Sequence, residues 1–229
     1  MNPSLVGSEM CIRDSSTSVL SSFSNQGQIC LCGSRIYIER KIYDKFKEAF
    51  LKKVKKLVVQ DPLSESTQIG ALVSEDHMNK VLQHIKVAKE EGGVILHGGE
   101  RILLSGRCEN GFFVSPTVIE GLPHNCRTNQ EEIFGPVVTL SPFDKEDEVI
   151  EYANGTQYGL SSTVWTKDLA KANKMAQELK AGIVWINCWL VRDLRTPFGG
   201  VKNSGVGREG GYYALQFFTE PTNVCISLN

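Results

Sequence analysis

Hydrophobic residues in this chain follow two different periods in turn, and that alternation limits the folds the chain can adopt. Short apolar runs typical of strands fall at residues 94–96, 112–114, 137–140, 160–165 and 183–187. Apolar residues recur every three or four positions at 42–57, 78–88, 144–153 and 168–179, as on one face of a helix. Strands that alternate with helices of this length indicate βαβ units. The sequence therefore predicts an α/β fold with a largely parallel sheet.

Composition and charge exclude several classes of protein. The chain has 229 residues, 41% hydrophobic and 22% charged, which suits an ordinary soluble protein with one large domain or one and a half. Its net charge of −1 gives no basis for binding nucleic acid, and no apolar run approaches the length of a membrane span. Seven cysteines without a C-x-x-C pair predict a reducing, cytoplasmic setting. The histidines and cysteines lack zinc-ligand spacing, so no metal site is predicted.

A polar run that contains a glycine leads to Cys30. The run reads F-S-N-Q-G-Q-I-C, and the apolar residues 36–38 follow, so Cys30 is expected on a loop or short helix before a strand. A cysteine is a useful nucleophile only where substrate reaches its thiolate, and Gly27 lets backbone approach a ligand closely. The alternative is a small buried core residue, as most free cysteines are. The run resembles the active-site cysteine signature of the aldehyde dehydrogenase family, which implies that Cys30 is catalytic.

A second motif, E-E-I-F-G-P at residues 131–136, lies just before an expected strand. A carboxylate followed two residues later by an aromatic ring can bind a ribose with one side chain and flank a planar ring with the other. The alternative is an exposed acid and a core phenylalanine ahead of a Gly-Pro turn. The motif resembles the E-x-F-G-P run of the same family. That resemblance implies that Glu132 binds the nicotinamide ribose of NAD and that Phe134 flanks the nicotinamide.

A glycine-dense segment runs from Thr196 to Glu209, and within it residues 205–210 satisfy the pattern G-x-G-x-x-G. We reject a dinucleotide-binding loop here, because no strand runs directly into the first glycine and no later strand supplies the acid that binds ribose. The run P-F-G-G-V-K-N-S-G-V-G-R-E resembles instead the loop near the C-terminus of aldehyde dehydrogenases. The resemblance implies that Phe198 lines the substrate tunnel.

Arg192 lies in a hydrophobic loop, N-C-W-L-V-R, next to this segment. An unpaired buried charge is costly, so the arginine needs a partner. One interpretation is an ion pair with Asp193 or Glu209. The other is that its guanidinium binds a carboxylate on the substrate, as bidentate geometry favours. The loop resembles the branch of the family that oxidises 2-aminomuconate and 2-hydroxymuconate semialdehydes, which implies a carboxylate-bearing aldehyde and a role in tryptophan catabolism.

The resemblance implies a domain plan and a chemistry for the whole chain. Residues 1–15 match nothing that follows and are expected to be a non-native leader, so they are left out of the predicted fold. Residues 16–207 correspond to the parallel-sheet catalytic domain of the aldehyde dehydrogenase fold, with most of the Rossmann-like NAD domain absent. Residues 208–229 correspond to a C-terminal helix and a strand, 223–228, that joins a neighbouring copy in a homo-oligomer. Family members place the general-base glutamate and the oxyanion-hole asparagine upstream of the cysteine, so this chain alone is expected to be inactive.

Two other classes of function stay open from the sequence. A non-catalytic α/β binding module would keep the fold while Cys30 is idle. A cysteine hydrolase would need a histidine base near Cys30, and the nearest in sequence, His77, has no signature around it. Cys32 and Cys188 are interpreted as packing residues, since the C-x-C spacing is too close for a relaxed disulfide in a strand-like segment.

Overall fold

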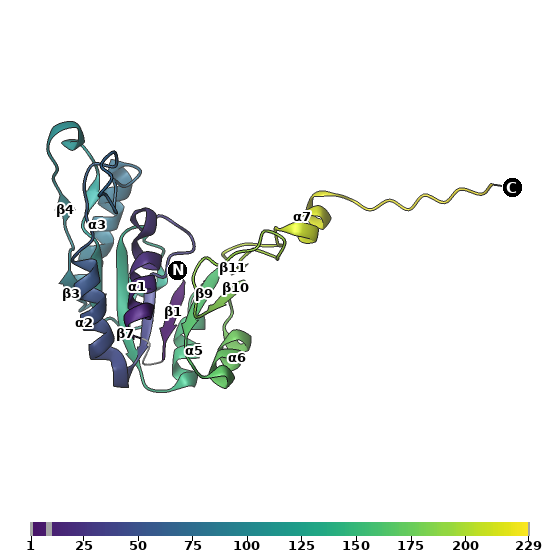
Figure 1. The fold of residues 1–229 in the computed structure, drawn as a ribbon, viewed down its shortest axis with the longest axis horizontal. Coiled ribbons are helices and arrows are strands. Elements are labelled where there is room, and N and C mark those ends of the chain that lie inside the picture. The colour runs from purple at the N-terminus through teal and green to yellow at the C-terminus, as the bar shows by residue number, and fades with distance from the viewer. Residues whose placement is uncertain (1, 8–10, 229) are drawn as a thin grey trace.

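The computed structural model describes residues 2–7 and 11–228, and most of its strands belong to one sheet (Figure 1). The strands of that sheet are β1 (Pro3–Val6), β2 (Arg35–Glu39), β3 (Val94–His97), β6 (Thr117–Glu120), β7 (Val137–Phe143), β9 (Ser161–Trp165) and β10 (Ile183–Ile186). Their order is β10-β9-β1-β2-β7-β6-β3. Every neighbouring pair is parallel except β3 with β6. The predicted α/β fold with a largely parallel sheet is confirmed.

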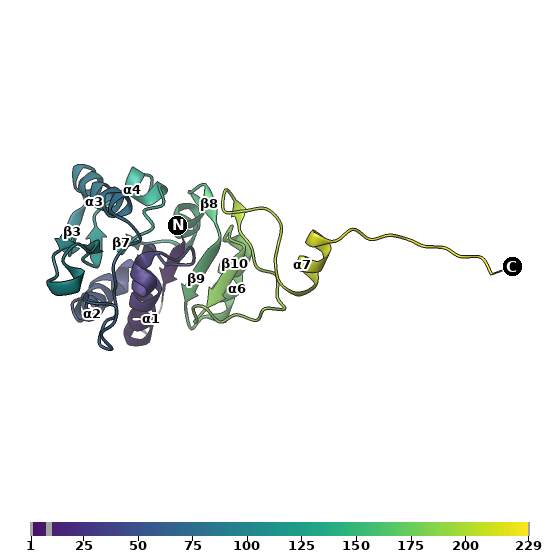
Figure 2. The same ribbon diagram turned by 90° about the horizontal axis from the view of Figure 1, so that it is seen from above.

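Helices cover both faces of this sheet. They are α1 (Cys11–Phe23), α2 (Tyr43–Val54), α3 (Glu75–Glu90), α4 (Arg127–Gln130), α5 (Glu146–Asn154) and α6 (Leu169–Glu178). A seventh helix, α7 (Gly211–Phe218), lies away from the sheet and has no buried residue. Because side chains alternate along a strand, Ile36 and Ile38 pack with α1 and α2, while Tyr37 packs with α5 and α6. A third cluster joins α3 to β6 and β7 on the Tyr37 side. Figure 2 shows α1 and α2 on one side of β7 and α3 on the other.

Short elements complete the loops around the sheet. They are the strands β4 (Arg101–Ile102), β5 (Phe113–Val114), β8 (Tyr158–Gly159) and β11 (Val201–Lys202), and the 3₁₀ turns η1 (Ser24–Gly27), η2 (Arg40–Ile42) and η3 (Gly106–Cys108). The pairs β4–β5 and β8–β11 are antiparallel. No helix within the described ranges is both long and apolar enough to cross a bilayer.

The exclusion of residues 1–15 from the fold is wrong. Strand β1 pairs in parallel with both β2 and β9 in the centre of the sheet, and all four of its residues are buried. Leu5 packs toward α5 and α6, whereas Val6 packs toward α1 and α2. Helix α1 then begins at Cys11, although residues 8–10 lie outside the described part of the chain. Four residues are too few to show strand periodicity in sequence, so only the sheet neighbours reveal this strand. That the segment is a non-native leader stays a prediction.

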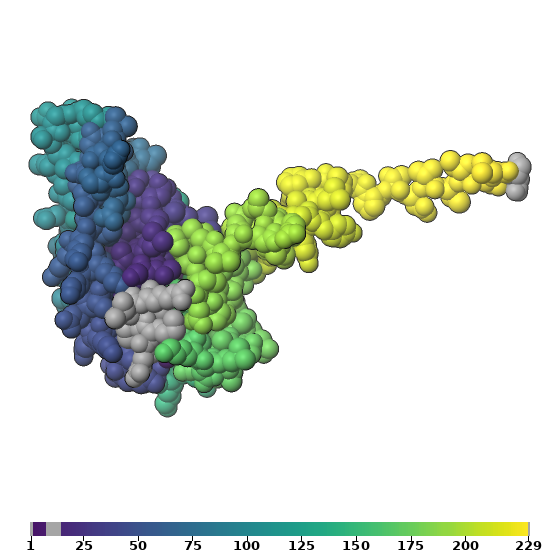
Figure 3. All heavy atoms as spheres, in the orientation of Figure 1, coloured from purple at the N-terminus to yellow at the C-terminus, as the bar shows by residue number. Residues whose placement is uncertain are grey.

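The C-terminal end of the chain projects away from the sheet. Helix α7 is followed by an extended, exposed segment through residue 228 (Figures 1 and 3). The strand expected at 223–228 does not form within this single chain, because no strand edge among the described residues lies beside it to accept its backbone hydrogen bonds. Its pairing with a neighbouring copy stays a prediction.

Candidate active site

Cys30 lies in a turn between α1 and β2, and its side chain is exposed. Helix α1 ends at Phe23, and the backbone then takes left-handed conformations from Asn25 to Gly27. The Cys32 N–H closes the turn on the Ile29 carbonyl at 3.0 Å. The alternative of a buried core cysteine is therefore wrong for Cys30. Cys32 does lie in the core, as interpreted, and burial raises the pKa of its thiol to about 11.

The backbone N–H of Cys30 has an open donor position. It donates to no acceptor within the described ranges, 2–7 and 11–228. The Cys30 carbonyl, by contrast, accepts a hydrogen bond from the Asn2 side chain, and the neighbouring Leu31 carbonyl accepts one from Trp189 Nε1 at 3.1 Å. The side chains of Asn2 and Trp189 therefore hold the turn in place through its carbonyl groups. The Cys30 N–H stays available to an oxygen atom bound next to the thiol.

The motif at Cys30 and the motif at Glu132 meet at two glycines. Strands β2 and β7 are parallel neighbours, so the segments that enter them lie at the same edge of the sheet. Gly27 has φ of +71°, and a Cβ atom there would lie 2.1 Å from the Gly135 carbonyl oxygen. Only glycine allows this backbone approach. The Cys30 loop (residues 24–34) and the Glu132 loop (residues 131–136) are thus in direct contact.

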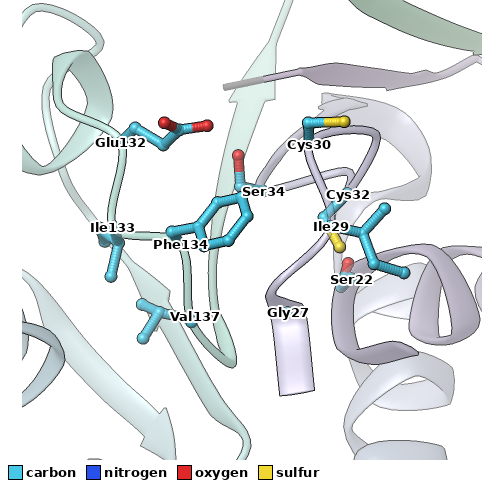
Figure 4. A pocket seen from close by; sticks show the side chains of 11 residues that line it. Ser22, Gly27, Ile29, Cys30, Cys32, Ser34, Glu132, Ile133, Phe134 and Val137 are labelled. Carbon is cyan, nitrogen blue, oxygen red and sulfur yellow. The ribbon is translucent and has the colours of Figure 1, made fainter. Parts of the chain in front are cut away.

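The two loops enclose a first pocket, with an empty volume of about 350 Å³. Its lining includes Cys30, Cys32, Ser34, Glu132 and Phe134. Figure 4 shows Glu132 and Phe134 extending from the Glu132 loop toward the segment that carries Cys30. Glu132 is half-buried, so its carboxylate faces the pocket while keeping contact with water. The structure therefore brings together three of the residues that sequence singled out.

A second pocket opens on the other side of Cys30, with an empty volume of about 910 Å³. Cys30 and Leu160 form one wall, and the glycine-dense segment from Phe198 to Glu209 forms another. Phe217 and Phe218 of α7 also line it. The glycine-dense segment holds the short strand β11 and lines this pocket. Phe198 exchanges backbone hydrogen bonds with Glu209, both at 2.8 Å, which fixes its ring at the pocket wall.

Arg192 contacts two residues that line this second pocket, Phe198 and Glu209. Its guanidinium is 4.1 Å from the centroid of the Phe198 ring, and Nη2 is 3.0 Å from Glu209 Oε1. The ion-pair interpretation named Glu209, and the structure contains that pair. The Arg192 side chain is still 38% exposed and is absent from the pocket lining. Asp193, the other candidate partner, binds Arg195 instead.

No histidine lines either pocket at Cys30, although all four histidines lie in the described ranges. His77 Nε2 lies 2.6 Å from the Phe134 carbonyl oxygen, and His124 stacks on Tyr152. His84 is buried against Glu131, and burial lowers its pKa. The cysteine–histidine pair that a cysteine hydrolase requires is not formed. Among the described residues no group of three histidine, cysteine or acidic side chains is arranged to hold a metal ion.

Sequence reasoning missed the contacts that hold the Glu132 loop. The Phe134 backbone has φ of +58°, which is uncommon for a bulky residue, and its carbonyl is held by His77. Lys80 Nζ donates to the Glu132 carbonyl at 3.1 Å. His77 and Lys80 lie three residues apart after the N-cap Ser74, so they share one face of α3. The three-residue spacing of His77 and Lys80 is the signal in the sequence that could have indicated these contacts.

Residues 12–224 match the aldehyde dehydrogenase family. Because the match extends over nearly the whole chain, the chain belongs to the aldehyde dehydrogenase family. Among solved structures, the NAD+ complex of aldehyde dehydrogenase from Bacillus cereus superimposes with a TM-score of 0.93 at 37% identity. That match covers 100% of this chain and 46% of the other. The structure of HpcC from Thermus thermophilus gives a TM-score of 0.91 at 38% identity, covering 100% and 47%.

Similar curated proteins include several semialdehyde dehydrogenases. The 2-aminomuconic semialdehyde dehydrogenase of Danio rerio is 47% identical over 95% of this chain and 45% of its own length. The 2-aminomuconic 6-semialdehyde dehydrogenase of Pseudomonas sp is 46% identical, over 90% and 42%. The 2-hydroxymuconic semialdehyde dehydrogenase of Pseudomonas sp. (strain CF600) is 42% identical, over 92% and 43%. The chain spans less than half the length of these relatives.

Proposed function

We propose that this chain is the cysteine-bearing part of an NAD-dependent dehydrogenase that oxidises a carboxylate-bearing semialdehyde to the acid. One observation carries the proposal: the exposed Cys30 thiol lies on a wall shared by two pockets. Aldehyde oxidation needs a nucleophile with the carbonyl group on one side and a hydride acceptor on the other. A binding module would have no need of an accessible thiol at that junction.

The proposed chemistry uses Cys30 as a covalent catalyst. Its thiolate adds to the aldehyde carbon and forms a thiohemiacetal, whose oxygen accepts a hydrogen bond from the free Cys30 N–H. Loss of a hydride from that carbon toward the first pocket restores the carbonyl and leaves a thioester on Cys30. Water then adds to the thioester, the C–S bond breaks, and the acid and the thiolate are released.

The first pocket has the right residues for the nicotinamide end of NAD. Phe134 offers an aromatic face to a planar ring, and the Glu132 carboxylate offers hydrogen-bond acceptors to ribose hydroxyls. When bound, NAD supplies the hydride acceptor. The role of these residues is to orient the ring toward the carbon attached to Cys30 and to exclude water from the path of the hydride.

Activation of the hydrolytic water is the step that these residues do not provide for. Within the described ranges, the carboxylates that line the two pockets are Glu132 and Glu209. Glu209 is paired with Arg192, and Glu132 is assigned to the ribose. We therefore propose that this chain alone does not turn over aldehyde with NAD, and that an activated ester acylates its Cys30 slowly, with loss of the alcohol.

The second pocket suits an aldehyde with a distant negative charge. Leu160, Phe198 and Phe217 give it apolar walls, and Arg192 contacts Phe198 and Glu209 of its lining. We propose that a substrate carboxylate replaces Glu209 as the ion-pair partner of the Arg192 guanidinium. Relatives named for 2-aminomuconic and 2-hydroxymuconic semialdehydes support this substrate class.

The free thiols of the chain bear on its cellular location, and its exposed apolar side chains bear on its assembly. We propose that it acts in the cytoplasm, where its free cysteines stay reduced. We also propose that it assembles with further copies, because α7 and the residues after it expose Phe218, Val224 and Ile226 to solvent.

The test is the rate at which iodoacetamide alkylates each cysteine, followed by peptide mass spectrometry. We expect Cys30 to react at least about tenfold faster than Cys188 and Cys126, because it is exposed and they are half-buried with raised pKa values. Cys225 is the matched exposed control. An aldehyde should protect Cys30 and leave Cys225 unchanged. Equal rates at Cys30 and Cys225, with no protection, would reject the catalytic role and leave a binding module.

A further inference from the structure

A third segment of the chain contacts both loops of the site. Residues 70–81, here called the bridging segment, lead into the first turns of α3. At its start, the Gly70 N–H donates to Gln26 Oε1 and Gln26 Nε2 donates to the Ala71 carbonyl, both at 3.2 Å. The Val73 N–H donates to Gln28 Oε1 at 3.1 Å. Two amide side chains of the Cys30 loop are therefore fixed to this segment.

The end of the bridging segment contacts the Glu132 loop. His77 Nε2 lies 2.6 Å from the Phe134 carbonyl oxygen, and the two rings meet edge to face at 6.3 Å between centroids. Val81 is fully buried, and a Cβ at Gly135 would lie 2.6 Å from Val81 Cγ2. The Glu132 loop is thus confined between α3 on one side and Gly27 of the Cys30 loop on the other.

The Phe134 backbone needs such support. A bulky residue with φ of +58° lies in a sparsely populated region and persists there only when its surroundings hold it. The carbonyl that His77 contacts belongs to this residue, and the same residue presents its ring to the first pocket. The backbone conformation at Phe134 therefore determines where the ring lies relative to Cys30.

We propose that His77 is a positioning residue for the site. It donates through Nε2–H to the Phe134 carbonyl, and so holds the Phe134 ring and the Glu132 carboxylate at a fixed place opposite Cys30. The consequence for catalysis depends on the proposed function, but the contact itself is tested independently of it. His77 touches neither the thiol nor the second pocket, so its loss should leave the reactivity of Cys30 within about twofold.

The experiment measures hydrogen–deuterium exchange of residues 131–138 in the purified chain. We expect His77→Leu to accelerate exchange there about tenfold, as loss of one partly buried hydrogen bond allows. His77→Gln keeps an N–H donor and should restore slow exchange to within about twofold of the unmodified chain. His97→Leu is the matched control, since His97 is also half-buried and lies on β3, away from both pockets.

Three outcomes would overturn the proposal. Unchanged exchange in His77→Leu would mean that His77 does not hold the loop. Equal acceleration in His77→Leu and His97→Leu would indicate general destabilisation, and equal acceleration in His77→Gln and His77→Leu would mean that the donated bond is not the cause. Selective alkylation of Cys30 is a separate readout, so the proposed function and this proposal can fail independently.

A measurement on the unmodified chain covers the case in which His77→Leu does not fold. The ¹⁵N spectrum of the histidine side chains at pH 8, where an ordinary imidazole is neutral, reports which ring nitrogen carries the proton. We expect His77 to carry it on Nε2, since only that tautomer can donate to the Phe134 carbonyl. A proton on Nδ1 would contradict the proposal directly.

Discussion

The two sides of Cys30 are built in different ways. On the side of the first pocket, loops enter neighbouring strands of the sheet, and Val81 and Ile133 behind them are buried. On the side of the second pocket, a glycine-dense segment leads into a helix in which no residue is buried. The first side is held by packing within the chain. The second is held by local backbone bonds and leaves its apolar side chains exposed.

Truncating an aromatic residue on each side should give the largest contrast in stability. Phe46 is fully buried in the cluster below the Cys30 loop, whereas Phe218 is 78% exposed on α7. We expect Phe46→Ala to lower the free energy of unfolding by about 3–5 kcal/mol, through lost burial and a cavity. Phe218→Ala should change it by less than about 0.5 kcal/mol. Urea denaturation measures both. Comparable losses would mean that α7 packs against the rest of the chain in solution.

Adding a methyl group at Gly27 tests the contact between the two loops. Gly27→Ala combines a left-handed backbone with a Cβ 2.1 Å from the Gly135 carbonyl, so we expect a loss of about 3 kcal/mol or more. Gly92 has φ of +90° but no atom within 4 Å of an added Cβ. Gly92→Ala should therefore cost only about 1 kcal/mol. Thermal or urea unfolding of the two variants separates contact from backbone strain, and equal losses would rule out the loop contact.

Removing the charge of Arg192 tests the substrate side. We expect Arg192→Gln to raise about tenfold the concentration of a carboxylate-bearing aldehyde that protects Cys30 from alkylation, because a charge-assisted hydrogen bond is lost. Protection by a neutral aldehyde should not change. Arg195→Gln is the matched control, since Arg195 binds Asp193 and lies away from the pocket lining. If both aldehydes lose protection equally, Arg192 supports the loop through Glu209 and does not bind substrate.

The smallest expected effect is on the free energy of unfolding at low pH, through a carboxylate next to the Glu132 loop. Glu91 accepts hydrogen bonds from Arg127 and Thr128 at the start of α4, which leads into that loop. Burial raises the pKa of Glu91, but the hydrogen bonds from Thr128 and Arg127 outweigh it, so the pKa lies below its ordinary value of 4.5. Its stabilisation is therefore present above that value and is lost as the pH falls through the folded pKa.

Glu91→Gln should lower the free energy of unfolding by about 1 kcal/mol or less at pH 7, and the difference should disappear as the pH falls toward 3. Urea denaturation between pH 3 and 7 measures it. Glu90→Gln is the control, because Glu90 is exposed and its ion pair with Lys86 is long, at 3.8 Å. A difference between Glu91→Gln and the unmodified chain that stays constant with pH would show that the carboxylate charge is not involved.

Sequence patterns located most of the elements but not all of them. The apolar runs at 94–96, 137–140, 160–165 and 183–187 correspond to strands, and the periodic segments correspond to α2, α3, α5 and α6. Strand β1 and helix α1 were missed because their residues carry too short or too polar a pattern. The expected strand at 223–228 has the right composition, but a strand forms only where a second strand accepts its hydrogen bonds.

The sequence alone determined the chemistry available to this protein: a thiol at Cys30, an acid and a ring at Glu132 and Phe134, and a cation at Arg192, six residues before Phe198. These are properties of side chains and of short motifs, which are readable without a fold. Only the tertiary structure decided which of them meet. Parallel pairing of β2 with β7 brings the Cys30 and Glu132 loops into contact. The Glu209 carboxylate forms an ion pair with the Arg192 guanidinium. Distances between residues a hundred positions apart are fixed by strand order and packing, which no local pattern encodes.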